Sequence, residues 1–142
     1  MSGARLVAVD LDGTLLRSDH TVSERSRDAL AAAREAQIEI VLATARSPRS
    51  TTLIAADAGL TGIAVCSNGA IVYDLATDQV LEHRPLAPEI AHRLVVRLRE
   101  RVPGAVFGWE HELRFGSEPA YEALRSEGWW PRPEGALSLI HI

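Results

Sequence analysis

The chain has 142 residues, of which 46% are hydrophobic and 24% charged, and its formal net charge is -4. This length suffices for one ordinary domain with a hydrophobic core, and the acidic balance argues against a nucleic-acid-binding surface. No apolar run is as long as a membrane-spanning helix, which needs about 18 residues. The N-terminus lacks a secretory signal pattern, and a single cysteine excludes an internal disulfide. We therefore expect a cytoplasmic protein with neither a nucleic-acid nor a membrane partner.

The first half of the chain alternates apolar runs with helix-forming segments. Three apolar runs predict strands that are covered on both faces: 6–9, 38–43 and 63–66. Thr21 and Glu24 have the spacing of a capping box before the Ala- and Arg-rich segment 25–36, and Pro48 suits the first turn of a helix that ends near Ala58. This alternation predicts parallel strand–helix–strand units and an α/β fold.

The pattern changes after residue 70. Segments 71–74 and 79–86 flank a short turn and predict an antiparallel hairpin. An amphipathic helix is expected from Pro88 onward. Further elements of a smaller α+β unit are predicted in the remaining segments: strands at 104–109 and 112–115, and a helix at 118–125.

A pair of carboxylates, Asp10 and Asp12, directly follows the first predicted strand. Ligands of parallel α/β sheets bind beyond the carboxyl ends of the strands, and two neighbouring carboxylates repel each other unless a cation is present. Their oxygens suit Mg²⁺, one carboxylate can attack phosphorus, and the other, when protonated, can supply a leaving group with a proton. The alternative interpretation is a solvated turn in which Gly13 is the turn residue.

The longer string at 10–14, Asp-Leu-Asp-Gly-Thr, is far more specific than the carboxylate pair alone. It resembles the first motif of the haloacid dehalogenase superfamily of phosphohydrolases. The string "LATAR" at 42–46 is similar to the second motif of that superfamily, and "SNGA" at 67–70 is similar to the Asn-Gly-Ala of its Cof-type subgroup. The resemblance implies a Rossmann-like parallel core into which an α+β cap domain is inserted after the third strand.

The resemblance also implies a role for each matching residue. Asp10 would be the nucleophile and a Mg²⁺ ligand, and Asp12 would be the general acid/base and would bind the metal through its backbone carbonyl. Residues that would bind the phosphate or line its site are Leu11, Thr44, Ala45, Asn68 and Gly69. For Arg46, a salt bridge or a contact at the helix start is as well supported as a contact with substrate.

Two later motifs of the superfamily are missing. The chain contains no lysine, so the lysine that neutralises nucleophile and phosphate has no counterpart, and no acidic pair in the right context follows Asp78. We therefore expect a C-terminally truncated chain. Its segments would be the first three core strands (1–80), a partial cap (81–136) and an apolar, non-native tail (137–142). Without later strands, the first strand would be an exposed hydrophobic edge at which chains self-associate.

The predicted activity is Mg²⁺-dependent hydrolysis of a small phosphorylated metabolite through an aspartyl-phosphate intermediate, and we expect this chain to be weakly active or inactive. Within the family that the motifs resemble, Asp12 favours a phosphatase or phosphomutase because it can activate the water that hydrolyses the intermediate. Two alternatives stay open. One is a phosphomutase, and the other is a non-catalytic fragment that binds phosphate or Mg²⁺ or complements a partner chain.

Overall fold

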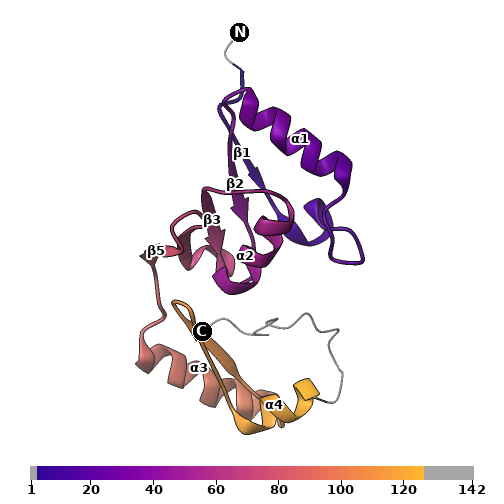
Figure 1. The fold of residues 1–142 in the computed structure, drawn as a ribbon. Coiled ribbons are helices and arrows are strands. Elements are labelled where there is room, and N and C mark those ends of the chain that lie inside the picture. The colour runs from indigo at the N-terminus through magenta and orange to yellow at the C-terminus, as the bar shows by residue number, and fades with distance from the viewer. Residues whose placement is uncertain (1–2, 127–142) are drawn as a thin grey trace. The chain divides into compact units, whose positions relative to one another are not determined.

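The computed structural model describes residues 3–126, which form two units (Figure 1). The first unit ends at His83 and the second begins at Arg84. The predicted tail at 137–142 and the end of the segment before it lie outside the described residues.

A five-stranded sheet forms the centre of the first unit. Its strands, in chain order and also in spatial order, are β1 (Leu6–Val9), β2 (Glu39–Ala43), β3 (Ile63–Cys66), β4 (Ile71–Asp74) and β5 (Gln79–His83). The pairs β1–β2 and β2–β3 are parallel, whereas β3–β4 and β4–β5 are antiparallel. The predicted α/β fold, the three parallel strands and the hairpin are confirmed, and the hairpin extends the same sheet.

The helices α1 (Glu24–Glu35) and α2 (Pro48–Asp57) connect the parallel strands. The predicted capping box is wrong by two residues. Ser23 is the N-cap of α1 and accepts a hydrogen bond from the Ser26 N–H, whereas the Thr21 N–H and hydroxyl both donate to the Asp19 carboxylate. The serine is favoured because it directly precedes the first helical residue, so its oxygen reaches an unpaired N–H of the first turn.

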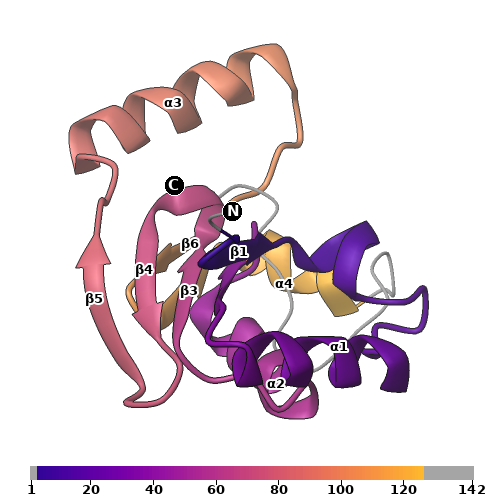
Figure 2. The same ribbon diagram turned by 90° about the horizontal axis from the view of Figure 1, so that it is seen from above.

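Only one face of the sheet carries these helices, as seen in Figure 2. Crossovers between parallel strands are right-handed in nearly all proteins, so two successive crossovers in one direction place both helices on the same face. Accordingly, Leu42, Ala64 and Cys66 are at most 1% exposed, whereas Val41 and Val65 on the opposite face are only half-buried. The prediction that the strands are covered on both faces is therefore wrong for the first unit.

Within residues 3–126, the strand β1 lies at the edge of the sheet, as predicted. Leu6 is 51% exposed and Val7 is 38% exposed. An apolar edge strand with unpaired backbone groups can pair with another strand.

The second unit contains α3 (Pro88–Arg101), the antiparallel pair β6 (Gly108–His111) and β7 (Arg114–Ser117), and α4 (Pro119–Ser126). Arg99 of α3 pairs with Glu118 and lies 5.3 Å from the centroid of the Phe107 ring. Glu118 also accepts a hydrogen bond from the Phe107 N–H at 3.1 Å, so one carboxylate connects the helix to the sheet. Across residues 3–126, every helix is too short or too polar to span a membrane.

Candidate active site

A pocket of about 440 Å³ lies at the carboxyl ends of β1, β2 and β3. Its lining residues are Asp10, Ala43, Thr44, Ala45, Val65, Asn68 and Gly69. Five of the seven predicted site residues are therefore brought together, although they come from three segments of the chain. The other two, Leu11 and Asp12, do not line this pocket.

Asp10 is held by a tight turn that begins where β1 ends. The Leu15 N–H donates to the Asp10 carbonyl at 3.2 Å, and Gly13 adopts a φ of 76°, a left-handed conformation that glycine enters at little cost. The Leu11 side chain is fully buried and anchors the turn in the core. The Thr14 hydroxyl donates to Asp10 Oδ2 at 3.2 Å, so the carboxylate is oriented while Oδ1 stays available to a ligand.

The loop after β2 contributes a hydroxyl and a backbone N–H to the pocket. Thr44 is only 6% exposed, its N–H donates to the Val65 carbonyl, and its Oγ1 accepts a hydrogen bond from the Arg46 N–H. The Thr44 hydroxyl proton is therefore free to point at a ligand. Ala45 is exposed, and its N–H has no hydrogen-bond partner within residues 3–126.

The third segment of the site is a left-handed turn at 67–69. Ser67, Asn68 and Gly69 have φ values of 52°, 55° and 91°. Two backbone hydrogen bonds hold this turn against the preceding loop, from the Ser67 N–H to the Arg46 carbonyl at 2.9 Å and from the Asn68 N–H to the Thr44 carbonyl at 3.2 Å. Non-glycine residues in this conformation cost of order 1 kcal/mol each, and such strain is common at ligand sites.

Asp12 is not among the residues that line the pocket, and it pairs with Arg46. Arg46 Nε donates to Asp12 Oδ2 at 2.8 Å and Nη2 donates to Oδ1 at 2.6 Å, so both carboxylate oxygens are engaged. These hydrogen bonds lower the pKa of the Asp12 carboxyl group below its usual value. The sequence leaves open whether Arg46 forms a salt bridge or contacts substrate, and in the structure it forms a salt bridge with Asp12.

The donor set of this site fits a hard divalent cation. Mg²⁺ prefers oxygen ligands and commonly uses one or two protein groups while it keeps positions for water and phosphate. The Asp10 carboxylate faces the pocket and is a suitable ligand. Both carboxylate oxygens of Asp12 already accept hydrogen bonds from Arg46, and the resemblance to the family implies that Asp12 would bind a metal through its backbone carbonyl instead.

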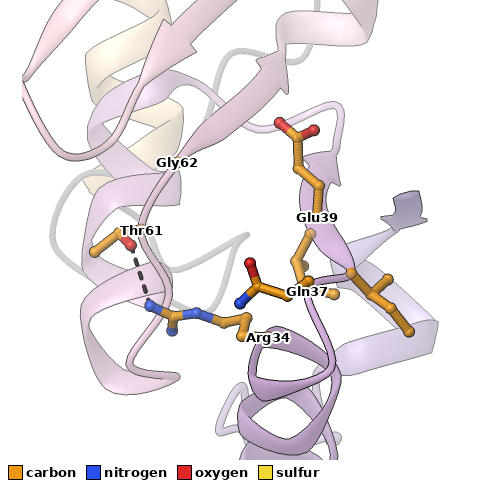
Figure 3. A pocket seen from close by; sticks show the side chains of 7 residues that line it. Arg34, Gln37, Glu39, Thr61 and Gly62 are labelled. Carbon is orange, nitrogen blue, oxygen red and sulfur yellow. Dashed lines mark hydrogen bonds between the residues drawn. The ribbon is translucent and has the colours of Figure 1, made fainter. Parts of the chain in front are cut away.

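A second pocket, of about 280 Å³, lies at the amino end of β2, beside Glu39 and Gly62 (Figure 3). Arg34 of α1 crosses it and donates to the Thr61 hydroxyl at 3.2 Å and to the Gly59 carbonyl at 2.5 Å. These hydrogen bonds tie α1 to the loop after α2. This pocket is at the wrong end of the strands for a ligand site of a parallel sheet.

The three parallel strands, the helices that connect them and the pocket at the carboxyl ends of these strands place the chain among the Rossmann-like α/β proteins. A sequence profile of the family described as haloacid dehalogenase-like hydrolase matches residues 7–118, and the chain belongs to this family. The resemblance inferred from the three motifs is thereby confirmed.

Several phosphatases are similar to the chain. The pyridoxal phosphate phosphatase YbhA of Escherichia coli K12 is 31% identical over 126 residues, which are 88% of this chain and 46% of the relative. An HMP-PP phosphatase of Klebsiella pneumoniae is 33% identical over 92 residues, which are 65% of this chain and 34% of the relative. These relatives are Cof-type phosphatases, the subgroup that the "SNGA" motif predicts.

A solved structure shares the fold. A haloacid dehalogenase-like hydrolase from B. subtilis superimposes with a TM-score of 0.72 at 27% identity, covering 87% of this chain and 42% of that one. The chain thus spans about half the length, or less, of the curated relatives and solved structures that it matches.

Proposed function

We propose that this chain provides the nucleophile and the phosphate-binding loops of a Mg²⁺-dependent phosphatase that acts on a small phosphorylated metabolite. The observation that carries the proposal is one pocket shared by the Asp10 carboxylate, the Thr44 side chain and the unpaired Ala45 N–H. A carboxylate nucleophile opposite hydrogen-bond donors is the arrangement that phosphoryl transfer needs. The relatives named for pyridoxal phosphate and HMP-PP support a small phosphorylated substrate.

In the first step, an Asp10 carboxylate oxygen attacks phosphorus and the bond to the leaving oxygen breaks. The leaving oxygen takes a proton from Asp12, which must first have taken up that proton from solvent, because its hydrogen bonds to Arg46 favour the ionised form. The Thr44 hydroxyl, the Ala45 N–H and the Leu11 N–H donate to the phosphoryl oxygens, and Asn68 and Gly69 border the site. Mg²⁺, when bound to the Asp10 carboxylate and the Asp12 carbonyl, would offset the negative charge on those oxygens.

In the second step, Asp12 takes a proton from a water molecule, whose oxygen attacks phosphorus. The bond between phosphorus and Asp10 breaks, which restores the carboxylate and releases inorganic phosphate. A phosphomutase would instead pass the phosphoryl group to a second hydroxyl, and the named relatives favour the phosphatase.

The exposed edge of β1 supports a second candidate, a non-catalytic fragment that binds phosphate or Mg²⁺ and pairs with other polypeptide. Leu6 and Val7 present an apolar edge beside Asp10, and we propose that this edge is where the chain self-associates or accepts a partner strand.

The deciding experiment is hydrolysis of p-nitrophenyl phosphate with and without Mg²⁺. It compares the wild type with Asp10→Asn and with Asp28→Asn, a matched control because Asp28 is exposed on α1. Mg²⁺-dependent turnover that is lost only in Asp10→Asn supports the phosphatase. Turnover no higher than that of Asp10→Asn refutes hydrolysis by this chain and favours the non-catalytic fragment.

A further inference from the structure

We infer that Arg46 is a positioning residue that holds the Asp12 carboxylate beside the phosphate pocket and neutralises its charge there until a ligand binds. The inference rests on the proposed function, in which the pocket takes a phosphoryl group and Asp12 exchanges protons with it. It adds a role for a side chain that does not itself line the pocket.

The two partners differ in how firmly they are fixed. The Arg46 side chain is 6% exposed and the Asp12 side chain is 51% exposed. Arg46 is held from a second direction as well, because its Nη1 lies 3.3 Å from Ser50 Oγ on α2. Any rearrangement of the pair is therefore a movement of Asp12, while Arg46 is the fixed anchor.

The geometry favours such a movement. Both Asp12 oxygens are hydrogen-bonded to Arg46, and Asp12 is absent from the pocket lining within the part of the chain that the structure describes. A general acid must come within hydrogen-bond reach of the leaving oxygen, about 3 Å. We therefore expect Asp12 to shift towards the pocket, with at least one of the two hydrogen bonds to Arg46 weakened, before it acts.

Charge explains why the resting pair matters for binding. A phosphate dianion in the pocket lies next to the Asp10 carboxylate, and a second bare carboxylate on the same turn would repel it. A guanidinium that takes both oxygens of Asp12 in a fork removes most of that repulsion, with a fit that a lysine ammonium does not offer.

Binding of inorganic phosphate in the presence of Mg²⁺, measured by calorimetry, tests this inference without requiring turnover. Arg46→Gln exposes the Asp12 charge and is expected to weaken phosphate binding about tenfold. Asp12→Asn is expected to strengthen it, and the double variant Asp12→Asn/Arg46→Gln to return it to within about twofold of the wild type. Arg46→Lys should lie between the wild type and Arg46→Gln, because an ammonium neutralises charge without the fork.

Two results would overturn the inference. If the double variant binds phosphate as weakly as Arg46→Gln, Arg46 contacts the phosphate directly. If phosphate affinity is equal in all variants, the salt bridge serves the fold alone. Should Arg46→Gln fail to fold, the comparison of Asp12→Asn with the wild type decides, since unchanged or weaker binding there contradicts the inference.

The proposed function fails by a different result. Wild-type chain that binds phosphate with this pattern but shows no turnover above Asp10→Asn would refute hydrolysis and leave the role of Arg46 intact. Turnover that depends on Asp10, combined with no recovery in the double variant, would refute the role of Arg46 alone. A wild type that binds no phosphate would overturn both.

Discussion

Replacing Leu11 by alanine tests whether the site is built on the core. Leu11 stands between the two carboxylates, and its side chain is 0% exposed although Asp10 and Asp12 face solvent. It belongs to the same buried cluster as Leu42 and Ile71.

Truncation of a fully buried leucine removes its transfer free energy and leaves a cavity, which together cost about 3 kcal/mol. Small domains lose roughly 4 °C or more of melting temperature per kcal/mol, so Leu11→Ala should lower the midpoint by about 10 °C or more. The measurement is urea and thermal unfolding followed by circular dichroism. Leu53→Ala is the matched control, because Leu53 is 62% exposed on α2 and should change the free energy of unfolding by less than about 0.5 kcal/mol.

Equal unfolding midpoints for Leu11→Ala and Leu53→Ala would refute the reasoning, since they would mean that Leu11 carries no core packing. A folded Leu11→Ala protein should also bind phosphate more weakly than the wild type, because the turn that presents Asp10 has lost its anchor.

Three further predictions concern single groups. Burial raises the pKa of Tyr73 to about 12, whereas an unfolded tyrosine ionises near 10, so stability should be lost as the pH rises from about 10 towards about 12. The chain has no lysine to titrate in that range, so Tyr73→Phe should flatten the alkaline unfolding curve, and an unchanged slope would contradict the assignment. Gly13→Ala places a side chain at a φ of 76°, where no other atom lies within 4 Å of the added Cβ. We therefore expect the free energy of unfolding in urea to fall by about 1 kcal/mol through backbone strain alone. An unchanged free energy of unfolding would show that the turn relaxes. Ser23→Ala should lower the free energy of unfolding by about 1 kcal/mol, whereas Thr21→Ala should leave α1 capped. A lower urea midpoint for Thr21→Ala than for Ser23→Ala would instead identify Thr21 as the N-cap.

Local patterns were enough to predict most elements of the fold. The run 63–66 coincides with β3, and the helix from Pro88 with α3, because apolar periodicity and proline placement act within a few residues. The prediction that the strands are covered on both faces failed for a non-local reason, since the handedness of two crossovers decides which face receives the helices.

The candidate site was predictable as far as it follows from chain position. Asp10, Thr44 and Asn68 were grouped through the resemblance of their segments to family motifs, and they lie together because residues at the carboxyl ends of parallel strands meet at one edge of the sheet. The sequence could not decide between a salt bridge of Arg46 and a contact of Arg46 with substrate. Asp12 and Arg46 are 34 positions apart, and only the folded sheet brings them together. The left-handed Ser67 was missed as well, because only Asn68 and Gly69 in that turn are residue types that favour a positive φ.

The salt bridge also affects how the site can balance charge. A phosphate dianion beside Asp10 adds two negative charges next to that of the carboxylate. Arg46 is the cation of the loop after β2, and it already neutralises Asp12. Backbone N–H groups such as that of Ala45 supply partial charges only. We therefore expect that this chain holds a phosphate tightly only with a divalent cation on Asp10, a stronger dependence on the cation than in a site with a free lysine. Phosphate affinity of the isolated chain should accordingly fall at least tenfold when Mg²⁺ is chelated, and affinity that survives chelation would mean that other cationic groups reach the pocket.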